Sequence, residues 1–520
     1  MQFIEGKNRS QSILFPDSLD QIIEQTNEVR LIDLFIESIN IADYSFAIKE
    51  SREGRPAYHP KDLLKLYVYG YLNRIRSSRQ LERECKRNIE LMWLMKQLTP
   101  DHNTVSNFRR DNEKAIRKVF RHTVSVARHF DLIGGTLVAG DSTKLRAQNS
   151  SKNNFNEAKI DRHLAYIESR LDEYNKSLAE ADNDHKKQII EQQIQKQNKR
   201  KKAYENLSNQ IVQSGQTQIS TSDPESRQLI TGSKTNEISY NIQSVADAKH
   251  CIEIDYKVTN SNDNVALSGM LRRTKKILGT TDFTVLYDKG YHTGSEIKKS
   301  LELGINVMVA IPLSSSNAPD VGYNMSEFIY DEVKDQYRCP QNQILISNGT
   351  WYNKKTGSNV YAVKHYKTQS CKTCPVKDSC TKMERGRLIE RSEYAPYIEI
   401  NRRNIEANKE IYKKRQSIIE HPYGTIKRQW GFNYIMTKKG IKRASADVGF
   451  MFTAYNLRRI MNIVERNLLV KFLKELVLLF FVKMMSLNGF IFKIREVLRL
   501  QYLRKELLRR SQNRFQEIYI

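Results

Sequence analysis

Three carboxylates in this sequence have neighbours that suit chemistry on a phosphodiester. Asp141 follows the apolar run TLVAG, and Asp288 follows the apolar run FTVLY. Sites in α/β sheets form at the carboxyl ends of strands. Glu420 is the only carboxylate from Ile411 to Ala446, a segment whose bases are Lys413, Lys414, Arg415, Lys427, Arg428, Lys438, Lys439, Lys442 and Arg443. An isolated acid in a segment that attracts polyanions indicates a role of its own.

Divalent metal ions would give the three acids a common task. Phosphodiester cleavage needs one oxygen activated and another stabilised, and two ions roughly 3.5–4 Å apart do both. Mg²⁺ and Mn²⁺ prefer oxygen ligands. We therefore predict that Asp141, Asp288 and Glu420 converge on a site for Mg²⁺ or Mn²⁺. Taken singly, each aspartate has the alternative of a turn or cap, and Glu420 that of a surface ion pair.

The backbone around Glu420 carries two conflicting signals. Glu420 and Lys427 are seven residues apart, which places them on one face of a regular helix. Pro422 disfavours helical backbone at His421. We therefore predict that the helix kinks or restarts just after Glu420, which leaves its register to Lys427 open.

The charge of the chain favours a polyanionic partner. The 520 residues include 85 Lys and Arg against 59 Asp and Glu, a formal charge of +26. Such an excess points to nucleic acid first, with a solvated basic surface as the alternative. The start of the chain has no signal-peptide core, and the apolar stretch Leu476–Val482 is too short to span a bilayer. We expect a cytoplasmic protein without a membrane partner.

Six cysteines in such a chain suggest thiols or metal ligands rather than structural disulfides. Cys371, Cys374 and Cys380 form a C-x2-C-x5-C pattern, and Cys339 lies upstream. Tetrahedral zinc takes four such ligands. We predict a structural Zn²⁺ on these four sulfurs, with free buried thiols or a redox role as alternatives. If Cys339 lies apart, His365 becomes the candidate fourth ligand.

A segment near residue 100 has features of a DNA-reading helix. The stretch TPDHNTVSNFRRDNEKAIRKVF reads as a turn followed by a helix. Thr104, Ser106, Arg109 and Arg110 fall in its first turns, as in a recognition helix. The alternative is an ordinary basic helix.

Three motifs together resemble the DDE class of bacterial insertion-sequence transposases. LVAGDSTKLRAQ contains Asp141, VLYDKGYHTGSEIK contains Asp288, and YKKRQSIIEHPYGTIKR contains the third acid. The last stretch resembles the Tyr-Arg-Glu-Lys signature of that class through Tyr412, Arg415, Glu420 and Lys427. Four residues separate Arg415 from Glu420, where the signature usually has three. The resemblance covers roughly residues 55–460.

The resemblance implies both an architecture and an activity. The class has an RNase H-like catalytic core, with the first Asp on its first strand, the second after its fourth strand and the Glu on a late helix. Asp141, Asp288 and Glu420 would bind two metal ions, cleave double-stranded DNA at the element ends and promote strand transfer into target DNA. Tyr412, Arg415 and Lys427 would contact phosphates, with Lys289 as a further DNA contact. The resemblance also implies a homodimer on DNA and a bacterial, nucleoid-associated location.

Two other functions stay open at this point. One is a metal-dependent DNA nuclease without strand transfer. The other is a non-catalytic DNA-binding repressor derived from a transposase.

The expected fold is α/β, a mixed sheet flanked by helices, with an all-helical N-terminal domain and two insertions. The runs Phe283–Tyr287 and Ile305–Ile311 read as buried parallel strands. Apolar residues at heptad spacing in Ile160–Leu178 predict a helical hairpin. We predict a DNA-binding domain at 1–133, the catalytic core at 134–155 and 214–312, the hairpin at 156–213, a loop-rich cysteine-containing insertion at 313–400, the last core helix at 401–465 and a helical tail at 466–520.

Overall fold

The computed structural model describes residues 18–47, 56–230, 236–312, 318–356, 359–436 and 439–479. The chain forms two compact units. Unit 1 combines Met1–Phe130 with Trp430–Ile520, and unit 2 is Asp131–Gln429. Part of the predicted C-terminal tail, and Lys438 of the basic segment, lie outside the described residues. None of the described helices is both long and apolar enough to cross a bilayer.

The described part of unit 1 is built from helices that share one apolar core. Helix starts are marked by capping side chains, such as Asn27 on the Val29 amide and Asp101 on the Asn103 amide, as expected for Asn and Asp at N-caps. The ring of Tyr67 stacks on that of Phe450, with centroids 4.7 Å apart. The elements are α1 (Leu19–Ile22), α2 (Glu28–Glu37), η1 (Ile41–Tyr44), α3 (Pro60–Leu72), α4 (Ser78–Cys85), α5 (Ile89–Leu94), α6 (His102–Asp111), α7 (Glu113–His129) and α15 (Ile441–Ile463).

Unit 2 is built on a six-stranded mixed sheet. Its path is β4-β5-β1-β7-β8, and β6 also pairs with β5. β1 is antiparallel to β5 and parallel to β7, which is parallel to β8. The predicted pair of buried parallel strands is thereby confirmed, and so is the mixed α/β class. The strands are β1 (Leu137–Arg146), β4 (Arg227–Ile230), β5 (Asn236–Asp247), β6 (Glu253–Thr259), β7 (Thr284–Tyr287) and β8 (Asn306–Val309).

One long helix packs its apolar side on this sheet. Helix α14 (Lys409–Tyr423) places Ile418 and Ile419 against Ala139 of β1 and Leu286 of β7. The predicted break after Glu420 is wrong in position, because α14 continues through Pro422. Proline removes one backbone donor, and a π-helical turn, η8 (Gly424–Gln429), follows directly. The remaining helical elements around the sheet are η3 (Asp263–Val265), α10 (Leu267–Leu278), η4 (Lys289–Tyr291), α11 (Gly294–Glu302) and α13 (Ala395–Ala407).

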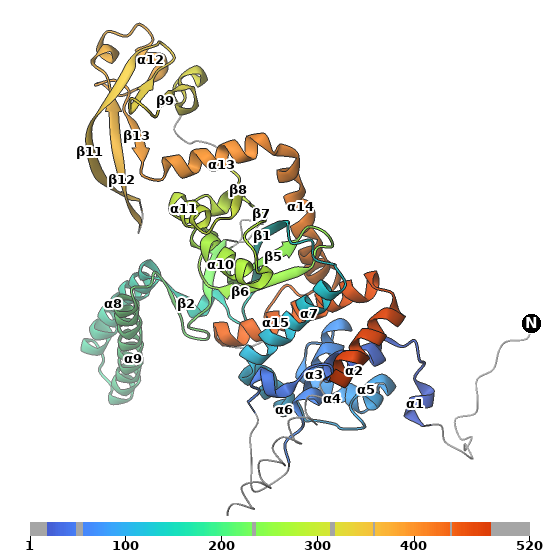
Figure 1. Ribbon diagram of the computed structural model, residues 1–520. Coiled ribbons are helices and arrows are strands. Elements are labelled where there is room, and N and C mark those ends of the chain that lie inside the picture. The colour runs from blue at the N-terminus through green and yellow to red at the C-terminus, as the bar shows by residue number, and fades with distance from the viewer. Residues whose placement is uncertain are drawn as a thin grey trace, which may run out of the picture. The chain divides into compact units, whose positions relative to one another are not determined.

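Two long helices lie side by side in unit 2 as an antiparallel pair (Figure 1). They are α8 (Glu157–Ala179) and α9 (Asp184–Ser214). Ile160 and Ile211 join Phe155 in a small buried cluster. The short strands β2 (Asn154–Phe155) and β3 (Ile219–Ser220), with η2 (Ser151–Asn153) before them, pair at the base of the two helices.

The segment that carries four cysteines is a second sheet rather than the loop-rich insertion expected from sequence. Its five strands are all antiparallel. Strand β11 is exposed on both faces along most of its length, so it lacks the alternation that identifies a half-buried strand. The elements are η5 (Val321–Tyr323), η6 (Met325–Glu327), β9 (Ile329–Asp331), β10 (Gln336–Arg338), β11 (Ile344–Thr356), β12 (Asn359–Lys367), η7 (Gln369–Lys372), α12 (Lys377–Cys380) and β13 (Ile389–Ser392).

Candidate active site

Asp141 lies within β1 of the main sheet, and Asp288 directly follows the neighbouring strand β7. The parallel pairing of β1 and β7 ends with Ala139 opposite Leu286. Each aspartate is two residues beyond that pair, so the two strands deliver the carboxylates at the same level. The predicted strand-end position is confirmed for Asp288, which directly follows β7, whereas Asp141 lies within β1 because that strand continues to Arg146.

The approach of the two strands depends on a glycine. A Cβ on Gly140 would stand 2.1 Å from Cζ of Tyr287. No side chain fits there without displacing the ring. Gly140 and Tyr287 directly precede the two aspartates. Their contact therefore sets how closely β1 and β7 approach next to the acids.

The carboxylate of Asp141 is held from two sides. Its Oδ1 accepts a 2.7 Å hydrogen bond from the Ser142 amide, and its Oδ2 accepts one of 3.0 Å from Nη1 of Arg415. Burial raises the pKa of Asp141 to about 6. The negative charge of Asp288 adds to the rise, while the Ser142 amide and Arg415 oppose it. Asp141 therefore responds to the charge of Asp288, as neighbouring carboxylates do.

Helix α14 and the turn after it hold the two strands that present Asp141 and Asp288. Tyr412 donates to the carbonyl of Tyr287 (2.8 Å), and Tyr423 donates to the carbonyl of Asp141 (3.1 Å). Nζ of Lys427 donates to Oγ1 of Thr143 (3.0 Å). Tyr412, Arg415 and Lys427 of the predicted signature thus all contact β1 or β7.

Glu420 does not join the two aspartates in this structure. Its side chain is exposed, and its Oε1 accepts a 2.7 Å hydrogen bond from Gln416 on the same helix. Ile419, one residue earlier, packs on the sheet. Within the described ranges, no three His, Cys, Asp or Glu side chains are grouped so that they could hold a metal ion. The convergence of the three acids stays a prediction.

A further acid lies beside the site, and the sequence analysis missed it. Oδ1 of Asp263 accepts hydrogen bonds of 2.7 Å from both Asn241 and Gln243, and its Oδ2 faces Nζ of Lys144 at 3.3 Å. Although burial opposes it, these donors and the Lys144 charge keep the pKa of Asp263 below its usual range. Its sequence context, SNDN, is indistinguishable from an ordinary turn.

The remaining predicted DNA contacts of unit 2 and unit 1 differ in exposure. Lys289, next to Asp288, is exposed. Ser106 is exposed, whereas Thr104 is half-buried and donates to Asp101 within α6. Arg110 is half-exposed and pairs with Asp111.

Arg109 requires a correction. Its side chain is 5% exposed, and its Nη1 lies 2.9 Å from the Tyr71 hydroxyl and 3.5 Å from Oδ1 of Asp447, which is fully buried. Arg76 pairs with the same carboxylate at 2.6 Å. A guanidinium enclosed in this network does not face solvent, as a base-reading side chain must. The local sequence around Arg109 does not indicate that it is buried or that its partner is Asp447, 338 positions later.

The four predicted zinc ligands line one pocket beside the second sheet. Cys339, Cys371, Cys374 and Cys380 all contribute to its wall. His365 lies elsewhere, with its ring stacked on that of Tyr352. Zinc itself stays a prediction.

Comparisons with known proteins agree with the sequence motifs. Residues 17–111 match a transposase domain family (DUF772), and residues 338–461 match a transposase DDE domain family. No curated protein matches the chain. One solved structure with similarity is "Cryo-EM structure of piggyBac transposase synaptic complex with hairpin DNA (SNHP)", with 10% identity over 87% of this chain and 79% of that chain. Its TM-score of 0.26 is too low to establish a shared fold.

The family matches confirm the resemblance and support a DDE-type transposase. The matched transposase domains, over residues 17–111 and 338–461, indicate a DNA transposase.

Proposed function

We propose that the chain catalyses metal-dependent cleavage at the ends of an insertion sequence and strand transfer into target DNA, with Asp141, Asp288 and Glu420 as its catalytic acids. The observation that carries the proposal is the placement of Asp141 and Asp288 at one level on neighbouring parallel strands. Two acids converge there although 147 positions of sequence separate them, and their charges interact.

The strand order supports an RNase H-like core. If the short strand β4 is set aside, the strands in chain order are β1, β5, β6, β7 and β8, arranged as β6-β5-β1-β7-β8. Asp141 lies on the first of these strands, and Asp288 directly follows the fourth. The DDE class places its first two acids in these positions.

The donor set at the site suits a hard divalent cation in part. Asp141 and Asp288 offer carboxylate oxygens, which Mg²⁺ and Mn²⁺ prefer, and two such ions would activate the attacking oxygen and stabilise the leaving one. Glu420 is proposed as a third ligand on the family signature alone, because its carboxylate is bonded to Gln416 in this structure.

The basic side chains around the acids would position DNA. Lys289 is exposed beside Asp288, and Lys413 and Lys414 are exposed on α14. We propose that they bind phosphates. Arg415 and Lys427 are tied to β1, so their first role is to hold the strand that presents Asp141. Double-stranded DNA is the proposed partner, and a homodimer would hold the two element ends.

The decisive experiment compares Asp141→Asn and Asp288→Asn with Asp282→Asn, an exposed aspartate of the same unit. Purified full-length protein is incubated with Mg²⁺ and DNA carrying the element ends, and cleavage and binding are measured separately. We expect the first two variants to lose cleavage by about 100-fold or more, as members of a catalytic unit do, while DNA binding and the Asp282→Asn control stay unchanged.

Cleavage at wild-type rate by Asp141→Asn or Asp288→Asn would contradict the assignment of the site. A second assay supplies pre-cleaved ends with a free 3′-OH and a target plasmid. Cleavage without joined products would favour the nuclease alternative. Specific end binding by the wild type without cleavage in Mg²⁺ or Mn²⁺ would favour the repressor.

A further inference from the structure

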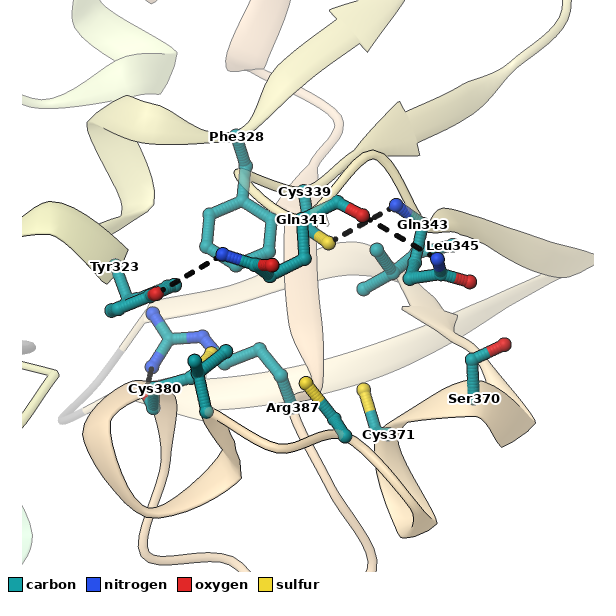
Figure 2. Close-up of a pocket in the computed structure, with 12 residues that line it drawn as sticks. Tyr323, Phe328, Cys339, Gln341, Gln343, Leu345, Ser370, Cys371, Cys380 and Arg387 are labelled. Carbon is teal, nitrogen blue, oxygen red and sulfur yellow. Dashed lines mark hydrogen bonds between the residues drawn. The ribbon is translucent and has the colours of Figure 1, made fainter.

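Four thiols of the second sheet come from separate stretches of chain and meet at one pocket. Cys339 follows β10, Cys371 lies in η7, Cys374 follows η7 and Cys380 ends α12. Figure 2 shows Cys339 on one side of the pocket and Cys371 on the other, with both sulfurs turned toward the space between them. All four are free thiols in the structure.

The backbone around two of these thiols is shaped for their positions. Sγ of Cys339 accepts a 3.3 Å hydrogen bond from the Gln343 amide, and such outer contacts orient metal ligands. Gly386 has a φ of 92° and carries no side chain next to Cys371, where a Cβ would stand 2.4 Å from the Cβ of Cys371. Both features hold a sulfur in place at the pocket wall.

Arg387 lines the same pocket, and one of its N–H donors has no acceptor among the described residues. Nη1 of Arg387 lies 3.4 Å from the carbonyl of Cys380. Its Nε is shielded from solvent and has no hydrogen-bond partner among the described residues. Figure 2 shows the guanidinium beside Cys380. A buried guanidinium donor without an acceptor is costly, and thiolate sulfurs would supply the missing negative charge.

The apolar core of this small sheet is thin. The buried cluster consists of Phe328, Tyr337, Leu345, Tyr366 and Ile389, and Cys339 and Cys380 pack against its edge. Small scaffolds with few core residues are commonly stabilised by a structural metal.

We propose that Cys339, Cys371, Cys374 and Cys380 bind one structural Zn²⁺, and that Arg387 balances the charge of the resulting site. Each thiol loses its proton to solvent on binding, since the thiolate is the ligand. Four thiolates and one Zn²⁺ carry a net charge of about −2, which the guanidinium partly offsets. The sulfurs would draw together to about 2.3 Å from the ion, since they are not yet grouped as a metal site among the described residues. This site is independent of the catalytic acids.

The test measures the zinc content of the purified full-length protein by elemental mass spectrometry after extensive dialysis. We expect about one Zn²⁺ per chain in the wild type. Cys339→Ser, Cys371→Ser, Cys374→Ser and Cys380→Ser should each lose most of it. Cys251→Ser is the matched control, because Cys251 is a cysteine that does not line the pocket.

A second measurement does not depend on the folding of the variants. Wild-type protein stripped of metal by a chelator is titrated with Co²⁺, whose absorption reports tetrahedral thiolate coordination. We expect thiolate-to-cobalt absorption bands that disappear when Zn²⁺ displaces Co²⁺.

Arg387→Met should weaken Zn²⁺ binding by about tenfold or more, as loss of an outer-shell partner does, while Arg387→Lys should retain part of the affinity.

Three outcomes would overturn the proposal. They are a wild type that binds neither Zn²⁺ nor Co²⁺, zinc retained at the wild-type level in all four serine variants, and disulfides among these cysteines after alkylation and mass mapping of the freshly purified protein.

Discussion

The ring of Tyr287 occupies the space that any side chain on Gly140 would need, with only 2.1 Å between Cζ and the position of a Cβ. The two residues precede Asp288 and Asp141, so a single steric contact links the two strands that present the acids. Tyr287 is fully buried and its hydroxyl has no hydrogen-bond partner in the described part of the chain. Its ring therefore serves packing at this point.

Gly140→Ala should destabilise unit 2 and impair cleavage together. The added methyl must displace a buried ring, and overpacking of this kind costs about 1–3 kcal/mol. Thermal unfolding and the end-cleavage assay would measure the two effects. Gly269→Ala is the matched control, because nothing lies within 4 Å of a Cβ at that helical position and alanine favours helix. Wild-type stability and cleavage in Gly140→Ala would contradict the proposed contact.

Arg109→Ala should lower the stability of unit 1 rather than its discrimination between DNA sequences. Loss of one partner from a buried charge network costs roughly 3 kcal/mol, and Asp447 would keep only Arg76 as a cation. Arg110→Ala removes a half-exposed pair with Asp111, which contributes less than about 1 kcal/mol. A calorimetric scan compares the two. An unchanged melting temperature in Arg109→Ala, together with a reduced preference for element ends, would instead support a role for Arg109 in reading the DNA sequence.

Glu253→Gln should remove a pH dependence of stability. Burial raises the pKa of Glu253 to about 8, from an ordinary value near 4.5. Between these values the folded state binds a proton that the unfolded state has released, so the stability of the wild type falls as pH rises through this window. Glutamine also accepts from Ser244, as Glu253 does at 3.1 Å.

The stability that Glu253→Gln gains over the wild type should therefore increase from about pH 5 to about pH 8.5. The increase should be on the order of a few kcal/mol, at about 1.4 kcal/mol per pKa unit. Denaturant unfolding at several pH values would measure it. Glu302→Gln, at an exposed site, should show no such growth. A gain independent of pH would refute the assignment.

Lys289→Ala should reduce the salt dependence of DNA binding. Each phosphate contact adds about 0.9 to the slope of log affinity against log salt, and Lys289 is exposed beside Asp288. Fluorescence anisotropy from 50 to 200 mM salt would give the slopes. Lys249→Ala is the control, since Lys249 already pairs with Asp131 at 2.6 Å. Equal slopes for wild type and Lys289→Ala would exclude a phosphate contact there.

The sequence was most informative where function depends on short segments. An apolar run followed by an acid correctly marked the end of β7 before Asp288 but not the end of β1, which continues past Asp141. Two apolar runs correctly predicted the buried parallel strands β7 and β8. The four cysteines, three of which are close in sequence, line one pocket, although among the described residues they are not grouped as a metal site.

Long-range partners could not be predicted. Nothing local to Arg415 indicates that it binds Asp141, 274 positions away, or that Asp447 encloses Arg109. The helix break predicted from Pro422 was misplaced for a different reason. A proline costs a helix one hydrogen bond and a steric clash, and a π-helical turn next to it, with the packing of Ile418 and Ile419 on the sheet, accommodates both.

The discontinuity of unit 1 has a consequence for biosynthesis. Its early helices are translated first, yet Phe450 and Asp447, which complete their core, follow an interval of about 300 residues. At about 5–20 residues per second, a ribosome needs roughly 15–60 seconds to bridge that interval. During this time the nascent N-terminal part of unit 1 exposes apolar surface that α15 and Phe472 later cover, so it is a natural client for chaperones. A message truncated within unit 2 would yield an aggregation-prone fragment rather than a free-standing helical domain.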